Sequence, residues 1–278
     1  MAKGIGLVGN FRGKVGNMVG YNLKDSNNKQ TQGVRVYQPV VKNPKTYAQA
    51  EQRAKLAPIN ATYRALKTVI DRGQESKAYG NKSRLAWLKD ALKAFNGGWY
   101  NKSAVITAPA LVPLTKGSIG GSLACDVSSD ELSYNFDTEA AAAPTTVAAL
   151  AAAMTAGSGL LKLGDQVTFV FCGTDSNGIQ VNVVSIVLDS TDTTTLESLG
   201  IDATESKVTI QTGVTCAAFA AIISRQGDGG EHLRNTTSLV ATDSYPASTQ
   251  GDAAKEAAIK SYMAAGTTSD WPEEQIQG

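Results

Sequence analysis

The stretch QVTFVFCGTDSNGIQVNVVSIVL, residues 166–188, decides the fold class of this chain. β-Branched and aromatic side chains dominate two runs in it, 166–172 and 180–188, and the polar sequence DSNG at 175–178 lies between them. Runs of this kind are typical of β-strands, and a cluster of Asp, Ser, Asn and Gly is typical of the turn between two strands. The stretch therefore predicts two strands.

Further segments from residue 118 onward have the same period of two and the same turn residues between them. They are 123–127, 132–136, 207–211, 217–224 and 238–241. About seven short strands favour a β-sandwich of immunoglobulin-like size. The uncharged, alanine-rich stretch 140–161 is predicted as a helical insertion between two strands, and residues 252–265 as a short helix before a polar tail.

The first 40 residues alternate glycine with β-forming side chains, and a polar cluster at 25–28 interrupts them. This pattern predicts a hairpin or an extended β-arm. Gly4, Gly6 and Gly9 fit the GxGxxG pattern, but a dinucleotide-binding fold needs a strand before these glycines, and only three residues precede them. We therefore interpret the glycines as permitting tight turns or close packing against another chain.

A helical segment is predicted to begin at Thr46. Thr46 and Gln49 have the spacing of a capping box, and Pro44 lies just upstream. Pro58 is expected to kink or restart the helix, because proline has no amide donor. Apolar residues recur at steps of three and four, which predicts one buried stripe. The stripe consists of Leu56, Ile59, Tyr63, Leu66 and Ile70.

A second helix is predicted over about 83–95, ended by Gly97-Gly98. Its expected inward residues are Leu85, Leu88, Leu92 and Phe95, with Lys89 and Lys93 outward. The two helices together predict an αα-hairpin with a basic outer face. Tyr63, Trp87 and Trp99 are interpreted as core or interface anchors rather than as platforms for stacking bases.

The net charge of +1 conceals a polarised chain. Residues 1–118 contain 20 lysines and arginines against 5 acidic residues, a net charge of +15, whereas residues 119–278 contain 6 against 20, a net charge of −14. This asymmetry points to an anionic partner for the basic half. Nucleic acid, another acidic surface and the acidic half of a neighbouring subunit all fit the pattern, and an ordinary solvated surface stays as the alternative.

The residues predicted to bind this partner share a positive charge and an expected position on the arm or on the outer helical faces. They are Lys14, Arg53, Lys55, Arg64, Lys67, Lys89 and Lys93. No membrane span is expected, because alanine makes the longest uncharged stretch too weakly apolar.

No catalytic, metal-binding or cofactor-binding residue is predicted. The single histidine, His232, lies in a glycine-rich turn without a recognisable triad. Four sandwich-loop aspartates do not have the spacing of a calcium loop. Three cysteines without a CxxC pair predict buried thiols rather than a disulfide framework or a zinc site. The four aspartates are Asp175, Asp189, Asp192 and Asp202, and the three cysteines are Cys125, Cys172 and Cys216.

The predicted fold class is α+β, mainly β, in four parts. Residues 1–40 form the glycine-rich β-arm, 41–118 the basic helical hairpin module, 119–250 the acidic, immunoglobulin-like β-sandwich with its alanine-rich insertion, and 251–278 a short helix and tail.

Two motifs carry a family resemblance. The first is GKVGN at 13–17, followed by VGY at 19–21. The second is NPKT at 43–46, followed by Gln49, Gln52, Arg53 and Lys55. They resemble the N-terminal signature of an uncharacterised family of Bacteroidota and their phages, in which a β-arm and a helix start precede a small β-sandwich. The match is best over 4–60 and looser at 164–171 and 217–224, and the alanine-rich insertion departs from it.

The resemblance implies a phage or prophage context and a non-enzymatic virion or assembly component, located in the virion and assembled in the host cytoplasm. The resemblance assigns no catalytic residues to this chain. The expected partners are further copies of the chain or other virion proteins, with possible DNA contact by the basic half. The alternatives are a nucleic-acid-binding protein that acts free of the particle, and a surface-adhesion module that binds a glycan or receptor.

Overall fold

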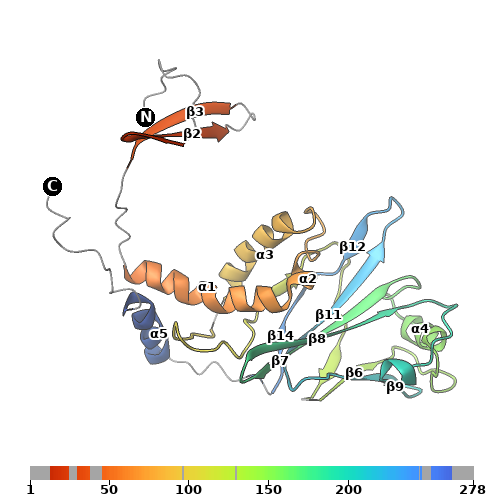
Figure 1. Cartoon of the computed structure of the whole chain (residues 1–278). Helices are drawn as coiled ribbons and strands as arrows, with labels where there is room; N and C mark the ends of the chain where they lie inside the picture. The colour runs from red at the N-terminus through yellow and green to blue at the C-terminus, as the bar shows by residue number, and fades with distance from the viewer. Residues whose placement is uncertain are drawn as a thin grey trace. The chain divides into compact units, whose positions relative to one another are not determined.

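The computed structural model describes residues 13–24, 30–37, 46–95, 97–128, 130–243, 245 and 252–264. Contacts within the chain divide it into two compact units, Met1–Lys45 and Thr46–Gly278. We describe each unit by itself (Figure 1). The glycine pattern at 4–9, the residues 43–45 of the second motif and the polar tail lie outside the described residues.

The first unit contains a three-stranded antiparallel sheet in the order β1-β2-β3. Its strands are β1 Gly13–Val15, β2 Met18–Lys24 and β3 Gln30–Val36. Gly16 in the β1–β2 turn has φ +56°, a left-handed conformation that glycine adopts without strain. On the β2–β3 pair, Tyr21 lies opposite Gly33, where a Cβ atom would come within 2.7 Å of the tyrosine ring. The predicted β-arm is thus a small sheet in its described part.

The second unit is built around a large antiparallel sheet in the order β12-β11-β7-β8, with β14 also paired to β11. The predicted strands at 166–172, 180–188 and 217–224 are confirmed and are its longest members. The strands are β7 Gln166–Asp175, β8 Gly178–Val187, β11 Cys216–Gln226, β12 His232–Arg234 and β14 Val240–Ala241.

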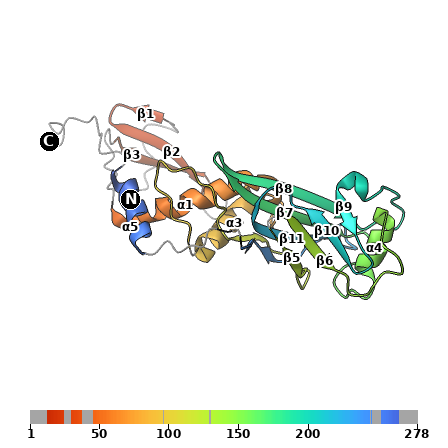
Figure 2. The same cartoon turned by 90° about the horizontal axis from the view of Figure 1, so that it is seen from below.

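A smaller sheet in the order β5-β6-β10-β9 covers one face of the large sheet together with α4 (Figure 2). The three predicted strands 123–127, 132–136 and 207–211 lie in it, and α4 is the helical part of the predicted insertion. The elements are β5 Cys125–Val127, β6 Glu131–Asn135, α4 Val147–Thr155, a short 3-10 helix Glu197–Leu199, β9 Ile201–Ala203 and β10 Lys207–Gln211.

Helices cover the opposite face of the large sheet (Figure 1). The helices are α1 Tyr47–Ala65, α2 Lys67–Ile70 and α3 Asn81–Ala94, and α5 Asp252–Ala264 packs on α1. A two-stranded pair, β4 Pro113–Thr115 with β13 Thr237–Ser238, lies beside them. The unit therefore has three layers, of helices, large sheet and small sheet, in which the predicted helical and sandwich segments share a core.

The central strand β7 shows why three layers form. Phe169 and Phe171 face the small sheet, whereas Val170 and Cys172 face the helices, and all four side chains are fully buried. A strand that is covered on both faces needs a continuous apolar run rather than alternation with polar residues. The class α+β with more strand than helix is confirmed, and the immunoglobulin-like topology stays a prediction.

Two details of the helix predictions are wrong. The helix does not restart at Pro58, because α1 runs through this residue and gives way to α2 only at Leu66. Pro58 is buried, so its ring contributes apolar burial that offsets the missing hydrogen bond. Leu85 is 61% exposed instead of inward, because the fully buried Trp87 anchors α3 and its indole Nε1 donates to Pro113 O at 2.6 Å.

Thr46→Ala should lower the free energy of unfolding by about 1 kcal/mol, the usual loss for a helix N-cap. The predicted cap is present, since Gln49 N–H donates to Thr46 Oγ1 at 3.3 Å. Urea denaturation measures the change, and Thr46→Ser should stay close to wild type because it keeps the hydroxyl. Equal stability of the alanine variant would contradict a stabilising cap.

Candidate functional site

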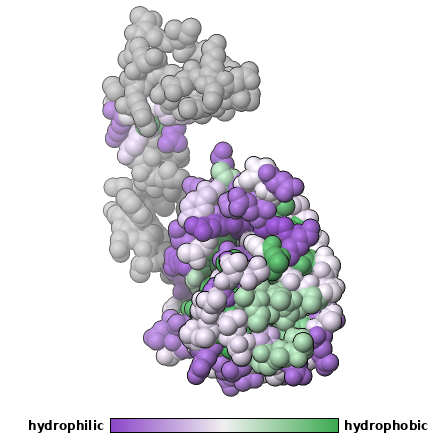
Figure 3. Space-filling view, turned by 90° about the vertical axis from the view of Figure 1, so that its right-hand side faces the viewer, coloured by the Kyte–Doolittle hydropathy of each residue, from purple (hydrophilic) through white to green (hydrophobic). Residues whose placement is uncertain are grey.

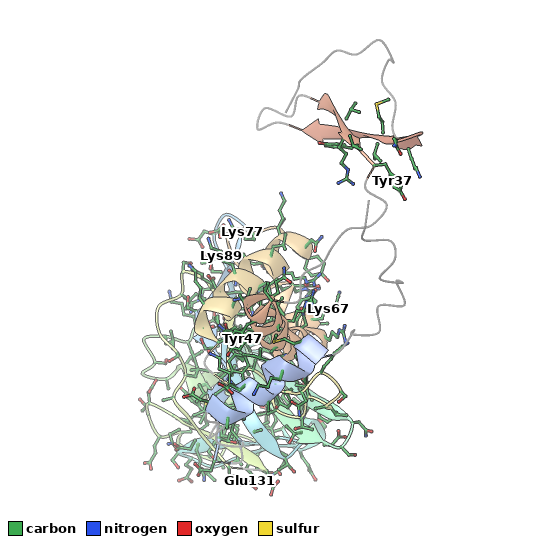
Figure 4. All side chains as sticks on the ribbon, turned by 90° about the vertical axis from the view of Figure 1, so that its left-hand side faces the viewer. Tyr37, Tyr47, Lys67, Lys77, Lys89 and Glu131 are labelled. Atoms are coloured by element: carbon green, nitrogen blue, oxygen red, sulfur yellow. The ribbon has the colours of Figure 1, made fainter. Side chains whose placement is uncertain are left out.

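The helical layer carries the positive charge of the second unit. Residues 46–118 contain 12 lysines and arginines against 4 acidic residues, a net charge of +8. Lys67, Lys77 and Lys89 lie at the helical end of the unit, and Glu131 of β6 lies at the opposite end (Figure 4). These three lysines and this glutamate therefore lie at opposite ends of the unit.

Three of the predicted partner-binding residues are available to a partner. Arg64, Lys89 and Lys93 are exposed, and none of them forms an ion pair with a described residue. Arg53 is half-buried on α1. Lys14 lies in the first unit, with its ammonium 3.5 Å from the centroid of the Tyr37 ring. The described basic face thus consists mainly of Arg64 on α1 and the two lysines on α3.

Lys67 and Lys55 already form ion pairs with carboxylates of the second unit. Lys67 Nζ lies 3.1 Å from Asp71 Oδ2, and the hydrogen bond to this carboxylate raises the pKa of the lysine. Asp71 also accepts a hydrogen bond from the Tyr63 hydroxyl at 2.9 Å. Lys55 Nζ lies 3.3 Å from Glu51. A charge reversal at either lysine would therefore disturb the fold as well as the surface.

Glu51 joins α1 to α5. Its Oε1 lies 3.2 Å from Lys255 Nζ, and the Lys255 and Lys55 ammonium groups lie 5.4 and 6.0 Å from the centroid of the Trp99 ring. The hydrogen bond from Lys255, followed by that from Lys55, holds the pKa of Glu51 below its usual value, against an opposing effect of burial. The cluster fixes α5 on α1.

The arm sheet has little core of its own. Among its residues whose burial the structure describes, only Gly20 is buried, whereas Met18, Val34 and Val36 are 42%, 50% and 74% exposed. Among the described strands, β3 pairs with β2 alone, which makes it an edge strand. A small sheet without a buried face is marginal in water, so the arm presents apolar side chains and a strand edge that need a partner.

A second strand edge is open on the other unit. In the described structure β8 pairs with β7 alone, and its ten residues carry no charge. Val183 and Val187 are 43% and 49% exposed on this strand. A long, neutral, β-branched edge strand is a ready site for another strand. The sequence analysis missed this edge, because strand order cannot be read from periodicity.

The surface around α4 differs from both charged ends. It is weakly apolar in the view that faces this end of the unit (Figure 3), and the stretch 140–161 contains no charged residue. Its exposed side chains include several alanines, which offer little surface to a partner. They are Ala141, Ala142, Ala143, Ala149 and Ala152.

Reactive groups are few in the described part of the chain. Cys172 and Cys216 are buried and Cys125 is half-buried, all three as free thiols, and burial raises the pKa of Cys125 and of Cys172 to about 12. These two thiols are protonated at neutral pH and so are poor nucleophiles. His232 is exposed at the start of β12. Within the described ranges, no three His, Cys, Asp or Glu side chains lie close enough to hold a metal ion.

None of the helices that the structure describes combines the length and apolarity needed to cross a membrane. Comparison of the chain with protein-family models, curated proteins and solved structures gave no match.

Proposed function

We propose that the chain is a non-enzymatic structural protein of a bacteriophage particle, a virion or assembly component that self-associates through its N-terminal arm and its charge-polarised surfaces. The resemblance of residues 4–60 to a family of Bacteroidota and their phages supports the phage context. Mass spectrometry of purified particles tests it: the chain should be present in a fixed stoichiometry, and its absence from the particles would contradict the proposal.

The proposal of self-association is supported mainly by one combination of features: the arm has little core of its own, and the two units have opposite net charges. Residues 1–45 contain 8 basic residues and 1 acidic residue, a net charge of +7, whereas residues 46–278 have a net charge of −6. Complementary charges speed encounter and select the partner. A second copy of the chain is therefore an electrostatically matched partner for the arm.

The free edge of β8 is the proposed acceptor for β3 of the neighbouring copy. Adding a strand pairs backbone groups that are otherwise left to water, and it brings exposed valines of the two strands into contact. Acidic residues lie before and after β8 in the sequence, and basic residues lie within the strands of the arm or next to them in the sequence. The acidic residues are Asp175, Asp189 and Asp192, and the basic residues include Lys14, Lys24, Lys29 and Arg35. Because such a contact joins two different surfaces, it builds rings or filaments.

Non-specific nucleic-acid binding is the second candidate function, favoured by the unpaired cations of the helical layer. The triple variant Arg64→Glu/Lys89→Glu/Lys93→Glu reverses these charges and leaves the Lys55 and Lys67 ion pairs in place. If this layer binds DNA, the variant should lose at least about tenfold in affinity for duplex DNA, and wild-type binding should fall steeply with salt through counterion release.

Sedimentation with and without DNA, at low and high salt, measures both functions. We expect the triple variant to remain folded and to self-associate through the arm as wild type does, with only DNA binding reduced. Loss of self-association at unchanged DNA affinity would instead place the helical layer in the subunit contact. Unchanged behaviour in both assays would show that these three charges are merely solvated.

A further inference from the structure

The helix-facing side of the large sheet changes character where its helical cover ends. Along β7, Cys172 and Val170 are fully buried under the helices, but Thr168 and Gln166 on the same side are increasingly exposed. The strand therefore continues beyond the apolar core with polar side chains. These side chains form the floor of a groove between α2 and the sheet.

The pairing register aligns the floor in two rows across the strands. In one row, Ser224 of β11 lies between Gln166 of β7 and Arg234 of β12. In the next row, Thr168 lies opposite Ser185 of β8, with their hydroxyl oxygens 3.0 Å apart. The groove has a volume of about 230 Å³, and Val69, Val183 and Ile222 add apolar surface to its lining.

The guanidinium groups of Arg72 and Arg234 lie at this groove, and none of the described residues that line it carries a carboxylate. Arg72 and Arg234 form no ion pair with any described carboxylate. Arg234 Nη1 donates to the Arg72 carbonyl oxygen, and Arg72 stacks on Tyr79 with 5.5 Å between the guanidinium carbon and the ring centroid. Burial, and then the Arg72 charge, lower the pKa of Arg234. The charge of Glu75 opposes this lowering, so the positive charge at Arg234 is partly compensated. The positive charge that remains on the two adjacent guanidinium groups favours an anion beside them.

Two of the three carboxylates that line the adjoining pocket have hydrogen-bond or ion-pair partners among the described residues. Asp71 accepts from Tyr63 and pairs with Lys67. Glu75 Oε2 accepts from the backbone N–H groups of Ser118 and Arg234, each at 2.9 Å. Glu231, the third carboxylate of that pocket, lies against the turn that contains Gly227 and Gly229. Apart from Arg234 Nη1, which donates to the Arg72 carbonyl oxygen, the guanidinium N–H groups are therefore left for a ligand.

We propose that this groove binds a carboxylate-bearing saccharide, with the carboxylate on Arg72 and Arg234 and the sugar hydroxyls on the row of Ser, Thr and Gln side chains. Guanidinium groups match the planar geometry of a carboxylate, and hydroxyl and amide groups can both donate to and accept from sugar hydroxyls. The apolar side chains in the lining suit the C–H face of a sugar ring. This inference is independent of the proposed assembly role.

Isothermal titration with methyl glucuronide, methyl glucoside and inorganic phosphate tests the site on the full chain. The glucuronide should bind at least about tenfold more tightly than either other probe, and Arg72→Gln and Arg234→Gln should each weaken it about tenfold or more. Lys89→Gln, which removes an exposed charge outside the groove, should bind as wild type does. If phosphate bound as tightly as the glucuronide, the groove would be a general anion site, and the proposed saccharide ligand would be overturned. If the glucoside bound as tightly as the glucuronide, the proposed role of the arginines would be overturned.

Ser185→Val provides a second test that does not depend on the arginines. Ser185 is exposed, and valine is favoured in strands, so the variant should fold. It removes a floor hydroxyl and adds bulk, and it should therefore weaken the glucuronide about tenfold while circular dichroism stays unchanged. Undiminished glucuronide binding by this folded variant would overturn the proposal, whatever the arginine variants do.

Discussion

Deletion of residues 1–45 is expected to abolish self-association and to leave residues 46–278 folded. The boundary between the two compact units falls between Lys45 and Thr46, and the core described above lies entirely in the second unit. The deletion removes a net charge of +7 and the exposed valines of β3. Because both the charge match and the added strand are lost together, the association constant should fall by about 100-fold or more.

Analytical ultracentrifugation and far-UV circular dichroism measure the two halves of this prediction. Removal of residues 265–278 is a matched control at the other end of the chain, since it shortens the chain outside the arm. Assembly that survives the loss of the arm would contradict the proposed contact. Unfolding of residues 46–278 alone would show instead that the arm contributes to the stability of the second unit.

Cross-linking locates the acceptor strand. When a Val34→Cys chain is mixed with a Val183→Cys chain under mild oxidation, we expect a covalent dimer that contains one chain of each kind. Val240→Cys places an equally exposed thiol on β14 and should not cross-link with Val34→Cys. An equal yield from both mixtures would exclude β8 as the specific acceptor.

The main strands could be predicted from sequence because their signals are local. Period-two runs and turn residues located β7, β8, β10 and β11. The strands β4, β9 and β12 were missed, since each has only three residues and is defined by its pairing partner rather than by a pattern. The predicted strand 238–241 is two short strands on different neighbours, β13 on β4 and β14 on β11.

The candidate sites also differ in whether their signal in the sequence is local or depends on strand pairing. The ion pairs Glu51–Lys55 and Lys67–Asp71 have i,i+4 spacing, so the sequence contained the signal that these lysines already have partners. The open edge of β8 and the row that joins Gln166, Ser224 and Arg234 depend on strand order and register. Both properties are set by tertiary packing, and no local pattern encodes them.

Replacement of Arg225 by methionine is expected to lower the free energy of unfolding by about 3 kcal/mol. Arg225 binds Asp165 through two hydrogen bonds of 2.6 and 2.7 Å, and its Nη2 also donates to Leu160 O at 2.8 Å. The Asp165 side chain is only 1% exposed, and its Oδ2 accepts from Lys162 N–H at 2.9 Å. Removal of one partner leaves a buried charge uncompensated, which costs about 3–5 kcal/mol in buried pairs. We expect the lower end of this range, because the arginine is 21% exposed.

The double variant Asp165→Leu/Arg225→Met separates this buried charge from the packing of the arginine stem. Apolar replacement of both partners removes the unpaired charge, so the double variant should be more stable than Arg225→Met alone despite carrying one more substitution. Urea unfolding of wild type, both single variants and the double variant gives the coupling energy between the two residues. Lys207→Met, which removes an exposed charge at the start of β10, should change stability by less than about 0.5 kcal/mol. If the double variant lost as much as the sum of the two single variants, the pair would be uncoupled, and the stability of this loop would come from its backbone hydrogen bonds, such as the one from Leu188 N–H to Asp165 O at 2.8 Å.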